Sequence, residues 1–281
     1  MDFGLVIFPT DLTVDPATLA GAAEDGGFDA LFVTEHTHIP VRRESPFPGG
    51  GELPDPYRRT YDPFVALSFA AAATERLEIG TGICLVTERD PIVTAKAVAS
   101  LHRLSGGRFL FGVGAGWNTE EMRNHGTDPA TRWTLMSERI SAMRAIWMSD
   151  EAEFHGRYVD FDPIWSWPKP SSHVPVLVGG VGERVLDRVV AFGDEWFPTN
   201  RGDDRALLAQ RIALLQDKAA AAGRDPIPVT LYGATAEPDA LATYEQVGVR
   251  RAVFTLPSTD AETVLGEVAR LADVVAAYRG A

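Results

Sequence analysis

Glu35, His36 and His38 form the densest group of proton-moving side chains in this sequence. They follow residues 30–34, an apolar run that predicts a buried β-strand. A histidine beside an acid can serve as a general acid or base, and two histidines with an acid can also begin a metal site. A metal would need further ligands from other predicted strand ends, which offer mainly Thr, Gly, Ala and Trp. We therefore expect Glu35 and His36 to be catalytic and expect no metal. The alternative is that His36 and His38 are polar loop residues.

Two further predicted strands end in glycine-rich loops. Residues 77–83 end in a Gly-Thr-Gly cluster before Ile83, and residues 108–113 run into Gly114, Ala115, Gly116 and Trp117. Small residues allow a ligand to approach the backbone closely, and the carboxyl ends of parallel strands meet at one rim. The pattern predicts a ligand site there, unless these glycines only make tight turns.

A third glycine cluster and an arginine-rich loop could bind an anion. Gly179 and Gly180 follow a strand predicted at residues 176–178 and precede a helix, where backbone N–H groups can face a phosphate. This cluster lacks the full dinucleotide spacing. Arg42 and Arg43, with two later arginines, lie in loop 40–62, which is either a clamp for an anionic ligand or simply solvated. Cys84 has apolar neighbours and is expected to be a packed, inert thiol.

Strands and helices alternate along the whole chain. Strands are predicted at residues 3–8, 30–34, 77–83, 108–113, 176–178, 195–198, 229–232 and 252–256, with helices between them. This alternation predicts a (β/α)8 TIM barrel with insertions after strand two (35–61) and before strand five (150–174). The second insertion begins with a hairpin that turns at His155-Gly156. We expect a single domain over residues 1–281; an open doubly wound sheet is the alternative.

Composition excludes several classes of protein. The 281 residues carry a formal net charge of −13 and form no basic stripe, which argues against nucleic-acid or anionic-membrane binding. No run approaches the roughly 20 apolar residues of a membrane span. One cysteine excludes an internal disulfide framework, and the N-terminus leads directly into a predicted strand. The expectation is a cytoplasmic enzyme with a small-molecule substrate.

The order of these motifs resembles the bacterial luciferase-like family of flavin and deazaflavin oxidoreductases, and most closely its F420-dependent branch. The matching run extends from Tyr61 to about Pro198. Its most specific parts are AAAATERLEIGTG and LSGGRFLFGVGAGW, and it also includes RWTLMSERISAMRAIW, FHGRYVDF, PVLVGG and GDEWFP.

The resemblance implies a barrel that holds a flavin or deazaflavin ring at its carboxyl rim. It also implies a non-prolyl cis peptide at Gly82-Ile83, forming a bulge behind the ring. Glu35 and His36 match the family's acid-histidine pair, with His36 facing the redox centre. The positions that match the cofactor site are Gly82, Ile83, Gly114, Ala115, Gly116, Trp117, Val178, Gly179 and Gly180.

One position departs from the family pattern. Trp117 stands where the F420-dependent sugar-phosphate dehydrogenases carry a glutamate proton donor, so that activity is not expected. The resulting prediction is an F420-dependent oxidoreductase, with Arg42 and Arg43 near the cofactor's carboxylate-bearing tail and a homodimer expected by family analogy. The alternatives are an FMN-dependent monooxygenase that uses O2 and a non-catalytic flavin-binding subunit.

Overall fold

Eight parallel strands wrap into a barrel in the structure, a computed structural model that describes residues 1–280. The sheet order is β10-β11-β1-β2-β3-β5-β8-β9, and parallel bridges Trp196–Val229 and Thr199–Tyr232 join β9 to β10. The prediction of a (β/α)8 barrel is confirmed. The barrel strands are β1 (Asp2–Ile7), β2 (Ala30–Val33), β3 (Glu78–Thr81), β5 (Phe109–Gly114), β8 (Val176–Gly179), β9 (Glu195–Phe197), β10 (Thr230–Tyr232) and β11 (Arg251–Thr255).

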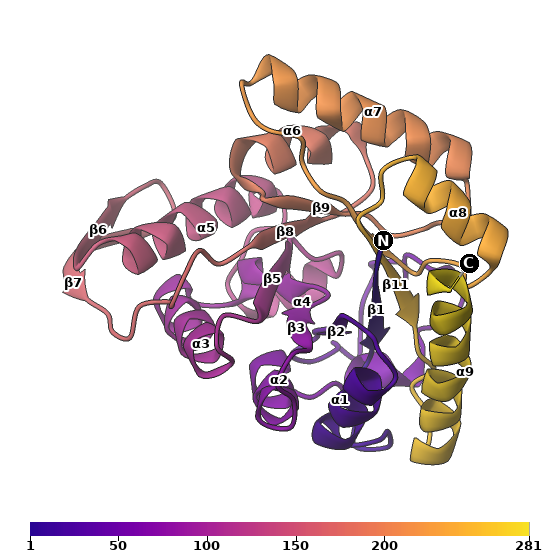
Figure 1. Cartoon of the computed structure of the whole chain (residues 1–281). Coiled ribbons are helices and arrows are strands. Elements are labelled where there is room, and N and C mark those ends of the chain that lie inside the picture. The colour runs from indigo at the N-terminus through magenta and orange to yellow at the C-terminus, as the bar shows by residue number, and fades with distance from the viewer. Residues whose placement is uncertain (281) are drawn as a thin grey trace.

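Helices surround the strands, and the N- and C-termini lie near each other at one side of the barrel (Figure 1). Asp15 and Asp62 accept hydrogen bonds from the first turns of their helices, and each is followed by proline, as the sequence predicts. The helices are α1 (Pro16–Asp25), α2 (Pro63–Ala72), α3 (Pro91–Leu104), α5 (Arg132–Met148), α6 (Glu183–Phe192), α7 (Arg205–Ala221), α8 (Pro238–Gln246) and α9 (Ala261–Arg279).

The two insertions lie where they were predicted. The first follows β2 and contains the short 3-10 helix η1 (Asp55–Arg58). The second forms the antiparallel hairpin of β6 (Glu151–His155) and β7 (Asp160–Trp165), which projects beyond α5 in Figure 1. Three short elements were not predicted: β4 (Cys84–Leu85), the 3-10 helix η2 (Val86–Glu88) and α4 (Thr119–Asn124). No helix within residues 1–280 is both long and apolar enough to cross a membrane.

Buried charges fill the amino end of the barrel. Arg251, at the start of β11, is fully buried and forms an ion pair with Glu78 at the start of β3. Glu195, at the start of β9, is also buried, and burial raises the pKa of its carboxyl although Arg251 opposes this shift. These paired groups close the amino end, so the carboxyl end is the one left open to a ligand.

Gly112 sets the distance between neighbouring strands. A Cβ atom at Gly112 would lie 1.9 Å from the carbonyl oxygen of Thr81, and the Thr81 hydroxyl donates to the Gly112 carbonyl at 2.6 Å. The contact is with backbone, which cannot rotate away as a side chain can. Glycine is therefore required where β5 passes the end of β3.

We predict that Gly112→Ala destabilises the protein by about 3 kcal/mol or more, because the barrel must deform to admit the methyl group. Gly21→Ala is the matched control, since Gly21 lies within α1 and a Cβ there meets no atom within 4 Å. That variant should gain about 0.5–1 kcal/mol from helix propensity. Chemical denaturation would measure both, and similar stability of the two variants would contradict the prediction.

Candidate active site

A cavity of about 680 Å³ opens at the carboxyl ends of the strands. Ten of the predicted site residues line it: Glu35, His36, Gly82, Ile83, Gly114, Ala115, Gly116, Trp117, Gly179 and Gly180. The sequence analysis did not single out several other lining residues, among them Phe8, Thr34, Phe47, Tyr57, Leu85, Trp133, Phe197, Thr199, Arg201 and Tyr232. The rim therefore unites motifs that lie up to about two hundred positions apart in the chain.

The Gly82-Ile83 peptide is cis, as predicted. The Ile83 side chain lies against two glycines of the cavity wall. A Cβ at Gly114 would lie 1.8 Å from Ile83 Cδ1, and a Cβ at Gly179 would lie 3.0 Å from Ile83 Cγ2. These two glycines make room for Ile83, which can then form an apolar wall of the cavity.

His36 has an acidic partner that the sequence did not reveal. Its Nδ1 lies 2.7 Å from Oε2 of Glu121, while Oε1 of Glu121 accepts a hydrogen bond from the backbone N–H of Thr37 at 3.2 Å. His36 is 7% exposed and Glu121 is fully buried. When the Glu121 carboxylate accepts in this contact, the hydrogen lies on Nδ1 of His36 and Nε2 is left for other chemistry.

Glu35 also lines the cavity, but its carboxylate contacts other groups than His36. Its carboxylate accepts a hydrogen bond from the backbone N–H of Leu85 at 2.7 Å and forms an ion pair with Arg89. Arg89 also pairs with Asp62 at the start of α2. Burial alone would lower the pKa of Arg89, but the two carboxylates outweigh it and raise that pKa. Glu35 thus connects the β2 end to the segment after β3, and Glu121 is the acid that contacts His36.

Aromatic rings enclose His36 on its cavity side. The ring of Tyr57 lies 5.2 Å from that of His36, and the ring of Trp117 lies 5.8 Å from it. Phe47 packs edge-on against both Tyr57 and Trp117. Burial raises the pKa of the Tyr57 hydroxyl. Loop 35–61, which supplies Phe47 and Tyr57, therefore covers part of the cavity and limits its contact with water.

The glycine loop after β8 leads into the N-terminus of α6. Gly180 has φ +124°, a conformation that favours glycine, and the N-cap Gly182 has no side chain to cap the helix. Free N–H groups and the positive end of the helix dipole make this a suitable place for a phosphate.

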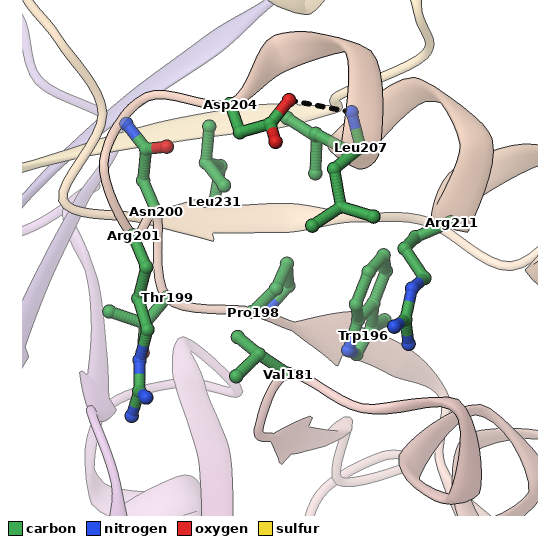
Figure 2. Close-up of a pocket in the computed structure, with 11 residues that line it drawn as sticks. Val181, Trp196, Pro198, Thr199, Asn200, Arg201, Asp204, Leu207, Arg211 and Leu231 are labelled. Carbon is green, nitrogen blue, oxygen red and sulfur yellow. Dashed lines mark hydrogen bonds between the residues drawn. The ribbon is translucent and has the colours of Figure 1, made fainter. Parts of the chain in front are cut away.

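A second cavity, of about 180 Å³, adjoins this loop. In Figure 2, Val181 lies below Pro198, Trp196 lies to the right of both, and Arg201 and Arg211 lie at opposite sides of the view. Asp204 accepts a hydrogen bond from the backbone N–H of Leu207 and so caps α7. Thr199 and Arg201 line both cavities. Arg201 therefore brings positive charge close to the glycine loop.

Some predicted residues lie away from the larger cavity. Val178 is buried in β8, one position before the lining residue Gly179. Arg42 is exposed and Arg43 half-buried, and neither lines the cavity, so their part in cofactor binding remains a prediction. Cys84 is fully buried, and burial raises the pKa of its thiol well above the usual range, which confirms a packed thiol.

Among residues 1–280, no group of three or more His, Cys, Asp or Glu side chains is arranged to hold a metal ion. His38 instead contacts the Thr37 hydroxyl at 2.9 Å and the Asn124 amide at 2.9 Å. It belongs to a polar network that extends to His125 through Thr37.

A sequence signal for Glu121 was available. Asn118 caps α4 and accepts a hydrogen bond from the backbone N–H of Glu121, three positions later. An Asn followed by Glu at this spacing is typical of a helix start. The signal locates the short helix, but it cannot show that Glu121 points back to β2.

Comparison with known proteins identifies the family. Residues 15–254 match the model of the luciferase-like monooxygenase family. An uncharacterized protein of Mycobacterium tuberculosis is 43% identical over 278 residues, which cover 97% of this chain and 98% of that protein. The crystal structure of monooxygenase RslO1 from Streptomyces bottropensis aligns with a TM-score of 0.79 and 19% identity, covering 99% of this chain and 98% of that one. An F420-dependent secondary alcohol dehydrogenase in complex with an F420-acetone adduct aligns with a TM-score of 0.78 and 19% identity, covering 99% of both chains. The two structures share the barrel fold with this protein, and the match over residues 15–254 shows that the chain belongs to the luciferase-like monooxygenase family.

Proposed function

We propose that this protein, as a single barrel domain, is an F420-dependent oxidoreductase that acts on a small organic substrate. The observation that carries the proposal is His36, held through Nδ1 by the buried Glu121, in the cavity that Ile83 also lines. When bound, F420 supplies a hydride donor or acceptor at its C5 atom. The chain's own residues bind the cofactor, exclude water and move a proton.

The cavity has the features that a flat ring with an anionic tail requires. Gly82, Ile83 and the stretch from Gly114 to Trp117 offer a largely apolar wall with no long side chain from the glycines. Gly179, Gly180 and the uncapped start of α6 offer N–H groups for a phosphate. Val178 would support this loop from behind, and Arg201 would stand near the negative charges of the tail.

His36 is the proposed proton carrier. Its Nδ1 is occupied by Glu121, and no hydrogen bond of Nε2 is found within the described part of the chain. Nε2 can therefore give a proton to, or take one from, an oxygen of the substrate. Glu35 supports this site through its contacts with Arg89 and Leu85. The hydrogen-bond contact with the His36 ring is made by Glu121 instead.

The substrate would lie between the cofactor and the aromatic side chains of Phe47, Tyr57 and Trp117. These rings favour an apolar or partly apolar molecule. An FMN-dependent monooxygenase is the second candidate, favoured by the overall likeness to a monooxygenase. Arg201 beside the glycine loop argues against FMN, because its positive charge is better suited to the several carboxylates of the F420 tail.

A homodimer is proposed as the assembled state. Val65 and Phe69 on α2 and Val93 on α3 are large apolar side chains with more than half of their surface exposed. The two helices are neighbours in the barrel, so these side chains form an apolar surface suited to a second copy.

We predict that F420 binds at least tenfold more tightly than FMN, a difference of about 1.4 kcal/mol. Fluorescence titration of the purified protein with each cofactor would measure it. Arg201→Gln should weaken F420 binding more than FMN binding, because only the F420 tail carries several carboxylates. Arg42→Gln and Arg43→Gln are the comparison variants. Tighter binding of FMN would reject the assignment, and a larger effect of Arg42 or Arg43 would move the tail to loop 35–61.

The phosphate site predicts a charge effect at Gly182. A Cβ at this position meets no atom within 4 Å, so Gly182→Asp should fold and cap α6. Its carboxylate would occupy the N–H groups and repel a phosphate, and cofactor affinity should fall about tenfold or more. Gly182→Asn caps the helix without the charge and should bind better than the Asp variant. Equal affinities of the Asp and Asn variants would place the phosphate elsewhere.

The role of His36 predicts that His36→Ala reduces turnover by roughly 10²–10⁴-fold while cofactor affinity changes far less. Reoxidation of reduced F420 with a panel of small carbonyl compounds would provide the assay. His38→Ala is the control, because His38 does not line the cavity. Wild-type turnover in the His36 variant would remove this residue from the mechanism.

A further inference from the structure

Glu88 is a buried acid directly behind the cavity wall. It ends η2 and is 6% exposed, and neither of its carboxyl oxygens has a hydrogen-bond partner of ordinary geometry among residues 1–280. A Cβ placed on Gly116 would lie 3.3 Å from Glu88 Oε1, so the carboxyl lies against the backbone of a cavity-lining residue. A buried carboxylate without partners is strongly disfavoured, which makes this side chain unusual.

The charged groups around Glu88 do not supply a free cation. From α4 it faces Glu121, and from the end of β2 it faces Glu35. Arg89 follows it in the chain but is paired with Glu35 and Asp62. From α5, Arg139 donates to the Val86 carbonyl at 2.8 Å, and its main charged neighbour is Asp90. The strand β5 contributes no charged side chain to this contact.

We propose that Glu88 is a neutral carboxylic acid at neutral pH, and that its neutrality leaves Glu121 as the single anion behind His36, where it accepts the hydrogen bond donated by Nδ1. The proton count is simple. One proton lies on Glu88, and a second lies between Nδ1 of His36 and Glu121. Glu121 is then the single anion behind the histidine.

The electrostatics of the site support this distribution. Burial, followed by the negative charge of Glu121, raises the pKa of Glu88 to about 9. Neither Glu88 oxygen has a hydrogen-bond partner in the described part of the chain, which favours the neutral acid over a second carboxylate near Glu121. Above this pKa a second negative charge would appear behind His36.

This inference rests on the proposed function only where it assigns His36 a role in turnover. Glu88 touches neither the cavity interior nor a ligand site, so it is a positioning residue that acts through Glu121. The proton on Glu88 and the coupling of Glu88 to His36 can both be measured without substrate or cofactor. A negative result in either measurement would leave the test of His36→Ala unaffected.

Infrared spectroscopy of the cofactor-free protein tests the proton. At pH 7 the wild type should show a carboxylic-acid carbonyl band that Glu88→Gln lacks, and the band should disappear as the pH rises through about 9. Glu120→Gln is the control. Although burial opposes ionisation of Glu120, hydrogen bonds from Ser45 and the Glu44 backbone lower its pKa to about 2, so its removal should not change the band. Absence of a Glu88-dependent band at pH 7 would overturn the proposal.

Coupling to Glu121 and His36 is tested with two further measurements. In Glu121→Gln the Glu88 band should titrate at lower pH, because the neighbouring negative charge is gone. In 15N spectra of histidine-labelled protein, assigned with His36→Ala, the neutral His36 ring should carry hydrogen on Nδ1. The 15N chemical shifts of His36 should show a step near the pH at which Glu88 titrates. Glu88→Gln should remove this step. An unchanged Glu88 titration in Glu121→Gln, or hydrogen on Nε2 in the wild type, would overturn the coupling of Glu88 to Glu121 and His36.

Discussion

The carboxyl rim of this barrel depends on pairing buried charges in a place with little water. Glu35, Glu88 and Glu121 come from three different segments and lie close enough at this rim for their charges to interact. Arg89 neutralises Glu35, and His36 contacts Glu121. A buried charge that lacks a partner costs several kcal/mol, so each group must be paired or hold its proton. The arrangement of β2, η2 and α4 follows from this requirement as much as from apolar packing.

The two ends of the barrel are filled by different kinds of residue. At the amino end, Arg251 fills the interior and pairs with Glu78, while Glu195 accepts from the Thr230 hydroxyl. At the carboxyl end, glycines line the wall and Ile83 lies against Gly114 and Gly179. One end is therefore closed by charge pairs, and the other keeps a cavity of about 680 Å³.

Loop 35–61 links the cavity to the surface. It supplies Phe47 and Tyr57 to the aromatic cover, and the backbone N–H of Thr37 holds the same carboxylate that holds His36. Exclusion of water by these rings would strengthen the interaction between His36 and Glu121, because charges interact more strongly in a medium of low dielectric constant. The insertion thus contributes both shape and electrostatics to the site.

The sequence by itself determined the strand and helix order, the helix starts at Asp15 and Asp62, and the rim position of His36. These features depend on local periodicity, capping residues and glycine clusters, all of which can be read within about twenty residues. The cis peptide at Gly82-Ile83 was available only through family resemblance. Tertiary structure alone decided that Glu121 contacts His36, that Glu35 pairs with Arg89 and that Glu88 lies unpaired behind Gly116. The physical reason is that barrel closure brings together side chains that lie tens of residues apart, and neither residue type nor spacing encodes which acid will face which base.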